Sequence, residues 1–79
     1  MTSNEILELD TASIGALVGK RFTVSYREER NGKMQAIRRD EKLIALDYSD
    51  NQKVNHYIFS DGVQHFKVPH THVVTLTQL

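Results

Sequence analysis

The sequence contains no cysteine, a single proline, no excess of either charge and no long apolar run. The absence of cysteine excludes disulfides, thiolate metal sites and cysteine nucleophiles, and it is typical of proteins in a reducing compartment. No stretch approaches the roughly 20 apolar residues of a membrane-spanning helix. The opening residues MTSNEILELD are acidic and lack the basic and apolar regions of a secretory signal. We therefore expect a cytoplasmic protein with no membrane partner.

The length and composition predict that residues 1–79 form one small globular domain. A chain this short has a small core. Hydrophobic residues make up 39% and charged residues 25%, which is ordinary for a globular protein. The zero net charge is unevenly distributed, because residues 20–42 hold eight of the ten Lys and Arg side chains and only four acids. This asymmetry marks the place at which a polyanion would dock.

Two short helices are predicted in residues 1–19, the N-terminal helical segment of the domain. Thr2 and Glu5 have the spacing of a capping box. Asp10 or Thr11 is expected to cap a second helix. Both helices are short, so they need packing against another element to be stable.

The rest of the chain has the pattern of short strands separated by turn signals. RFTVSYRE alternates apolar and polar residues, and Asn31-Gly32 is the strongest short hairpin signal. The return strand MQAIRRD is expected to end in a turn at Asp40-Glu41. Later strands are expected at KLIALDY, KVNHYIFS, VQHFKV and HVVTLTQ. Pro69 interrupts the chain before the last strand, where a single helical turn is expected.

The expected fold class is mainly β, with five to six short strands and one or two short N-terminal helices. It is a small SH3-like barrel or a strongly bent antiparallel sheet. The order of elements is similar to that of Sm-like and other SH3-like barrels, with LVGKRFTV as the first strand. MQAIRRDEKLIALDY contains neither of the two motifs that form the RNA pocket of Sm-like proteins, so the resemblance implies a fold and no function. The expected core comprises Leu17, Val18, Phe22, Val24, Ile37, Leu43, Ile44, Leu46, Ile58, Phe66, Val68, Val74 and Leu76.

The candidates for a metal site are His65, His70 and His72, three of the four histidines. Zinc needs about four ligands, and Asp61 is the only carboxylate close to them in sequence. The spacing H-x4-H-x-H matches no ligand signature. We therefore predict no metal and no cofactor, and interpret these imidazoles as part of the end of the sheet.

The sequence contains no catalytic motif that we can identify. It lacks G-x-S-x-G, and GALVGK does not have the spacing of a phosphate-binding loop. A domain this small also has little room for a deep pocket with several convergent polar groups. We predict that the protein is not an enzyme.

The basic arm, residues 27–42, is the best functional lead. Alternation places Arg27 and Arg39 on an outward face near Tyr26, and arginine beside an exposed tyrosine is a common way to hold single-stranded RNA or DNA. The neutral net charge and the acids of the arm favour instead a solvated hairpin, with ion pairs of Glu28 or Glu29 with Lys33. The candidate nucleic-acid-binding residues are Tyr26, Arg27, Arg30, Lys33, Arg38, Arg39 and Lys42.

The favoured function is a small non-catalytic interaction module or adaptor that acts through protein–protein contacts or self-association. Small barrels leave strand edges open to a partner. Ile6, Leu7 and Leu9 are expected to pack against a neighbouring subunit. The alternative is a weak single-stranded nucleic-acid-binding barrel that uses the basic arm. That alternative predicts a salt-sensitive interaction, which the double variant Arg38→Glu, Arg39→Glu abolishes.

Overall fold

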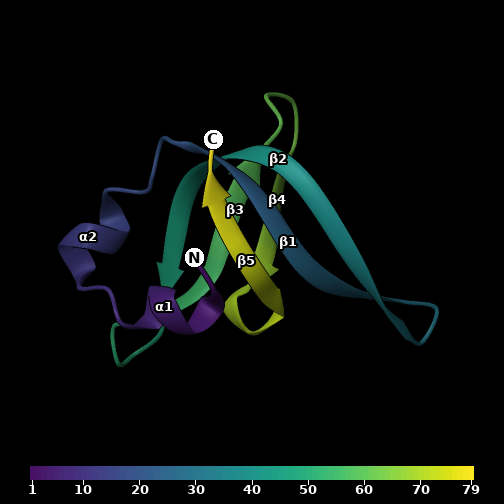
Figure 1. Ribbon diagram of the computed structural model, residues 1–79, viewed down its shortest axis with the longest axis horizontal. Helices are drawn as coiled ribbons and strands as arrows, with labels where there is room; N and C mark the ends of the chain where they lie inside the picture. The colour runs from purple at the N-terminus through teal and green to yellow at the C-terminus, as the bar shows by residue number, and fades with distance from the viewer.

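Five strands form one antiparallel sheet in the order β4-β3-β2-β1-β5 in the computed structural model, which describes residues 1–79. The strands are β1 (Arg21–Arg30), β2 (Lys33–Tyr48), β3 (Val54–Ser60), β4 (His65–Pro69) and β5 (Val73–Gln78). The sheet bends strongly, so that β3 and β4 lie behind β1 and β5 in the view of Figure 1. The predicted mainly β fold class is confirmed, and the strand order is compatible with an SH3-like barrel.

Two short helices, α1 (Ser3–Leu7) and α2 (Thr11–Gly15), begin at their predicted caps. The Thr2 hydroxyl accepts the Glu5 N–H at 3.3 Å, and the Glu5 carboxylate accepts the Thr2 N–H at 3.1 Å. The Asp10 carboxylate accepts a backbone N–H in the first turn of α2 at 2.7 Å. None of the helices has the length and apolar character that crossing a bilayer requires.

The helices cover the core instead of presenting apolar side chains to a neighbour. Ile6 of α1 is 0% exposed and Ile14 of α2 is 4% exposed, and both belong to the central cluster. Leu9 packs against the same cluster, and Leu7 is half-buried. The expectation that Ile6 packs on another subunit is therefore wrong, because the protein's own sheet buries it.

The predicted turn at Asn31-Gly32 is confirmed and sets the register of the first hairpin. Asn31 has φ 54° and Gly32 has φ 76°, the positive values that a two-residue hairpin turn requires. Arg30 is paired with Lys33 directly beside the turn, and the pairing continues without a shift to Arg21 and Lys42.

The outer end of this hairpin projects from the body of the sheet (Figure 1). The pairing of β1 with β5 ends at Tyr26 and Val73, so beyond this point β1 is paired with β2 alone. Residues 27–36 therefore form a two-stranded ribbon, which we call the hairpin extension. The longest dimension of the molecule is 37 Å.

The predicted turn at Asp40-Glu41 does not exist, because β2 runs through it as one strand of 16 residues. Asp40 faces outward, and its carboxylate accepts the Thr23 hydroxyl at 2.6 Å. Glu41 faces inward, and its carboxylate accepts the Arg39 Nε–H at 3.1 Å. Each acid has a partner on its own side of the sheet, so two adjacent carboxylates are accommodated within the strand.

Three β-bulges, one each on β2, β3 and β5, shift the inward face of the sheet by one residue, and two of them affect predicted core residues. Ile44 is an extra residue after Leu43 on β2, and Val74 is an extra residue after Val73 on β5. In a regular strand the next inward side chain comes two residues later, but across a bulge it comes three residues later. Ile44 is therefore only half-buried and Val74 is 41% exposed, although both were predicted to be in the core.

The core lies between the two halves of the bent sheet and under α1 and α2. Five predicted members are buried: Phe22, Val24, Leu43, Val68 and Leu76. Six are half-buried: Leu17, Ile37, Ile44, Leu46, Ile58 and Phe66. Two predicted members are exposed and therefore wrong: Val18 and Val74. The prediction missed Ile6, Ile14, Tyr26, Val54, Tyr57, Phe59 and Val73.

Candidate functional site

The basic arm is divided between the two faces of the sheet. Arg39 lies opposite the buried Val24 and shares its inward face, whereas Arg38 lies opposite Ser25 and faces outward. The predicted outward position of Arg39 is therefore wrong. This assignment could have been made from the sequence, because counting outward along both strands from the two-residue turn at Asn31 pairs Arg39 with Val24 and Arg38 with Ser25.

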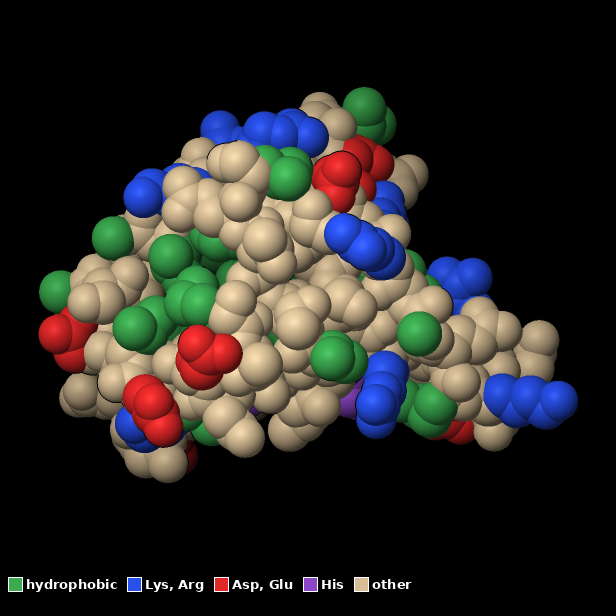
Figure 2. Space-filling view, in the orientation of Figure 1, with side chains coloured by type: hydrophobic (Ala, Val, Ile, Leu, Met, Phe, Trp, Pro, Cys, Tyr) green, Lys and Arg blue, Asp and Glu red, His purple; other side chains and the backbone are tan.

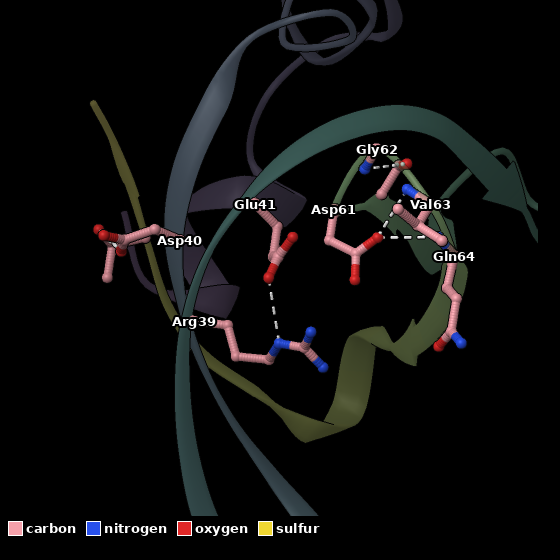
Figure 3. Close-up of polar contacts among 9 residues, drawn as sticks. Arg39, Asp40, Glu41, Asp61, Gly62, Val63 and Gln64 are labelled. Carbon is pink, nitrogen blue, oxygen red and sulfur yellow. Dashed lines mark hydrogen bonds and ion pairs between the residues drawn. The ribbon is translucent and has the colours of Figure 1, made fainter.

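Arg39 is held in a cluster on the concave side of the sheet (Figure 3). Its Nε lies 3.1 Å from a carboxylate oxygen of Glu41, which is only 7% exposed. Its guanidinium carbon lies 4.5 Å from the centre of the Phe66 ring, within the range of a cation–π contact. The Asp61 carboxylate, in the turn between β3 and β4, points toward the same guanidinium in Figure 3.

The pKa values of Arg39 and Asp61 are shifted in the directions that favour their charged forms. Partial burial by itself lowers the pKa of Arg39, but contacts with Tyr26 and Glu41 outweigh it and raise the pKa above its ordinary value. Two backbone N–H groups in its own turn, each 2.8 Å away, hold the pKa of Asp61 below its ordinary value, and Arg39 adds to this effect. The charge of Arg39 is thus engaged by Glu41 on its own strand and by the Phe66 ring on β4.

Two further candidate nucleic-acid-binding residues are also engaged within the protein. Tyr26 is 7% exposed and its ring centre lies 6.4 Å from that of Phe66, so the predicted use of Tyr26 as an exposed stacking platform is wrong. Arg30 contacts Glu28 at 2.9 Å along the same strand. The predicted ion pair of Glu28 or Glu29 with Lys33 across the hairpin is not present among the ion pairs.

Three of the four remaining cations of the arm lie on the outward side, whereas the register places Lys33, opposite Arg30, on the other side of the ribbon. None of the four forms an ion pair. Arg27, Arg38 and Lys42 are exposed, and Arg21 lies directly opposite Lys42. Sequence reasoning missed Arg21 because it lies before the basic arm, although the register of the hairpin places it there. Figure 2 shows Lys and Arg side chains bordering a broad area without charge. We define the polar face as the outward-facing residues Arg21, Thr23, Ser25, Arg27, Arg38, Asp40, Lys42, Thr75 and Thr77.

The histidines that were the metal candidates lie in different environments. His65 is exposed on β4, and His72 is half-buried in the short 3-10 helix η1 (His70–His72). His70 is buried, and its Nδ1 is hydrogen-bonded to the Tyr57 hydroxyl at 2.7 Å. Burial lowers the pKa of His70 and raises the pKa of Tyr57. No three His, Asp or Glu side chains are grouped as metal ligands, and no pocket is present.

The two edge strands of the sheet differ in how their backbone groups are covered. The N-terminal amine of Met1 donates to the Leu76 carbonyl at 2.7 Å, and the Leu76 N–H donates to the Met1 carbonyl at 2.7 Å. Thr2 forms a further bridge with Thr75. The start of the chain therefore covers the outer edge of β5, whereas no strand is paired with the outer edge of β4.

The register of β4 identifies which of its backbone groups are free. The Asp61 N–H donates to the Gln64 carbonyl at 3.3 Å, so this pair closes the β3–β4 hairpin with a hydrogen bond. Bonded and non-bonded pairs alternate along an antiparallel ladder. With the register of β3 and β4, Phe66 and Val68 bond to β3. His65 and Lys67 therefore direct their N–H and C=O groups outward.

Two surfaces remain available to a partner: the open edge of β4, and the polar face on β2, β1 and β5. They lie toward opposite ends of the strand order, so one partner need not exclude another. Comparisons of the chain with protein-family models, curated proteins and solved structures gave no match.

Proposed function

We propose that this protein is a small non-catalytic interaction module that binds an extended segment of a protein partner along the open edge of β4. The single observation that supports this most is the contrast between the two sheet edges. The edge of β5 is covered by Met1 and Thr2, whereas the outward N–H and C=O groups of His65 and Lys67 have no strand beside them. Addition of a strand to such an edge is a recurrent mode of peptide recognition.

The side chains of β4 favour a particular kind of strand. Lys67 and His65 lie on the outward side of the edge, and Phe66 is half-buried on the inward side. An added strand would place alternate side chains next to these two environments. A segment that alternates acidic and apolar residues matches both.

The same side chains disfavour pairing between two copies of β4. Antiparallel pairing of two such edges would gather Lys67 and His65 of both copies on one side of the sheet. Like charges on neighbouring strands are destabilising. Lysine and proline on an edge also limit unselective pairing, and Lys67 and Pro69 provide both on β4. A partner of complementary charge is therefore favoured over self-association.

The test uses a short synthetic peptide that alternates Glu and Val, with a Lys–Val peptide of the same length as the charge control. Amide hydrogen exchange is followed by NMR, because it reports each backbone N–H separately. The expected result is that the amides of His65 and Lys67 exchange rapidly in the free protein and become protected with the Glu–Val peptide only. Sedimentation measurements at several concentrations establish whether the free protein is a monomer.

Two variants at one position separate the backbone contact from the charge. Lys67→Pro removes the outward N–H, which has no partner on β3, and is expected to abolish protection. Lys67→Thr removes the charge but keeps the N–H, and is expected to weaken binding without abolishing it. Protection that rises with protein concentration in the absence of peptide would identify a second copy as the partner. The proposal would be contradicted if the protein is a monomer and neither peptide changes the exchange of the His65 and Lys67 amides.

A further inference from the structure

We propose that the polar face binds the phosphodiester backbone of a single-stranded nucleic acid. This inference is independent of the β4 edge and concerns the other end of the sheet. It differs from the predicted basic-arm interface, because Tyr26 and Arg39 are buried or engaged inside the sheet and are not part of it. Arg21 and the hydroxyl side chains of β1 and β5 take their place.

The register brings the residues of the polar face into rows across three strands. Arg38, Ser25 and Thr75 form one row on β2, β1 and β5. Lys42 and Arg21 form a second row on β2 and β1. Arginine, lysine, serine and threonine are the side chains that contact phosphate and sugar groups in nucleic-acid complexes. The rows therefore place cations beside hydroxyl donors on one continuous surface.

One acid lies within this surface and must be counted against it. Asp40 is exposed and lies between the two rows, opposite Thr23, which in turn lies opposite Thr77. Its carboxylate accepts the Thr23 hydroxyl at 2.6 Å, so one of its oxygens is already engaged. The four cations Arg21, Arg27, Arg38 and Lys42 still outnumber Asp40 and the outward-facing Glu29.

The length of the surface favours a polymer over a small anion. Arg38 and Lys42 are four residues apart on β2, or about 13 Å, and Arg21 and Arg27 are six residues apart on β1, or about 20 Å. A single phosphate can reach one neighbouring pair of cations, Arg21 with Lys42 or Arg27 with Arg38, whereas an extended strand can contact all four. The ligand class that fits is a polyanion whose charges follow one another along a chain.

With the exception of Asp40, the acids of the chain lie outside the polar face. Residues 1–19 contain three acids, Glu5, Glu8 and Asp10, and no Lys or Arg. The helices that carry them lie on the opposite side of the view from the hairpin extension (Figure 1). A molecule of zero net charge can thus present a positive surface to a polyanion, and the absence of an aromatic residue from the polar face predicts binding with little base preference.

The test measures fluorescence anisotropy of a labelled oligo(dT) and a labelled oligo(rU) at several salt concentrations. Four phosphate contacts predict a slope of log K against log[salt] of about −3 for a single strand. The double variant Arg21→Gln, Arg38→Gln is expected to reduce the size of the slope by about 1.4 and the low-salt affinity by about tenfold. The matched control Arg30→Gln, Lys33→Gln removes the same charge from the end of the hairpin extension and is expected to leave both nearly unchanged.

A gain of affinity provides a second readout that misfolding cannot imitate. Asp40→Asn keeps an acceptor for Thr23 but removes the negative charge, and is expected to tighten binding severalfold. Lys67→Pro, which blocks the β4 edge, is expected to bind the oligonucleotide as the wild type does. This pair of variants separates a failure of the present inference from a failure of the proposed function.

Four outcomes would overturn the inference. The first is absence of binding at low salt. The second is equal loss of affinity in the face variant and in its matched control. The third is unchanged or weaker binding by Asp40→Asn. The fourth is displacement of the oligonucleotide by polyglutamate or phosphatidylserine vesicles at equal charge concentration, which would identify an acidic protein or a membrane surface as the ligand.

Discussion

The hairpin extension and the body of the sheet use the same antiparallel pairing, yet only the body buries one face of it. Phe59 and Leu43 in the body are fully buried, whereas Glu28 is the only residue of the extension that is even half-buried. The reason is that β5 and the core end at Tyr26, so the extension has no second layer to pack against. A two-stranded ribbon is marginally stable by itself.

The alternation of inward and outward side chains therefore has different consequences for burial in the two regions. In the body, inward and outward positions differ in burial, so a residue such as Arg39 is tied into the structure by Glu41 and Phe66. In the extension, both faces meet water, and side chains such as Met34, 55% exposed, have no packing role.

The largest expected difference between the body and the hairpin extension is the loss of stability when an apolar side chain is truncated. Phe59→Ala in the body is expected to lower the free energy of unfolding by about 3–5 kcal/mol, because it leaves a cavity in the core. Met34→Ala in the hairpin extension is expected to change it by no more than about 0.5 kcal/mol. Urea denaturation followed by circular dichroism measures both. A comparable loss in the two variants would mean that the extension also packs against something.

A smaller difference in stability is expected between variants of the two adjacent arginines of β2. Arg39→Ala removes the partner of the buried Glu41 and a contact with Phe66, and is expected to cost about 1–3 kcal/mol. Arg38→Ala removes an exposed side chain without an ion pair and is expected to cost no more than about 0.5 kcal/mol. The same urea denaturation compares the two variants. Equal costs would refute the assignment of these neighbours to opposite faces.

The smallest expected effect is a pH dependence confined to the body. Burial lowers the pKa of His70 in the folded protein below its ordinary value of 6.5. As pH falls, the unfolded chain therefore binds a proton at His70 before the folded protein does. The contribution of His70 to stability is complete above the ordinary pKa and is lost as pH falls from there toward the lowered folded pKa.

Thermal unfolding between pH 7 and pH 5 measures this contribution. His70→Gln is expected to flatten the decline, and the exposed His65→Gln, as the matched control, is expected to keep it. Amide exchange in the hairpin extension should not follow the same pH dependence, because the extension contains no histidine. An unchanged decline in His70→Gln would assign the effect to another group.

Local signals predicted a good part of the fold. The capping pair Thr2 and Glu5, the cap Asp10 and the turn at Asn31 each act through neighbours within a few residues, and the structure contains all of them. Pro69 ends β4, and the short helical turn before the last strand is also present. These features depend on contacts that a short stretch of sequence contains in full.

The candidate surfaces were less predictable. The register of the first hairpin follows from its two-residue turn, and it would have shown that Arg39 faces Val24 and that Arg21 joins Lys42. The cover over the β5 edge could not be read in the same way, because Met1 and Leu76 are at opposite ends of the chain. Which edge is open is therefore a property of the folded molecule.

The sequence by itself determined the mainly β class, the helix caps, the first hairpin turn and the excess of cations in residues 20–42. Only the tertiary structure decided that β2 continues through Asp40 and Glu41, that bulges at Ile44 and Val74 shift the inward face, and that β4 is the open edge. The physical reason is the distance along the sequence between the residues that interact. Caps and turns are made by adjacent residues, whereas a buried acid, a bulge or a covered edge depends on partners supplied by distant strands.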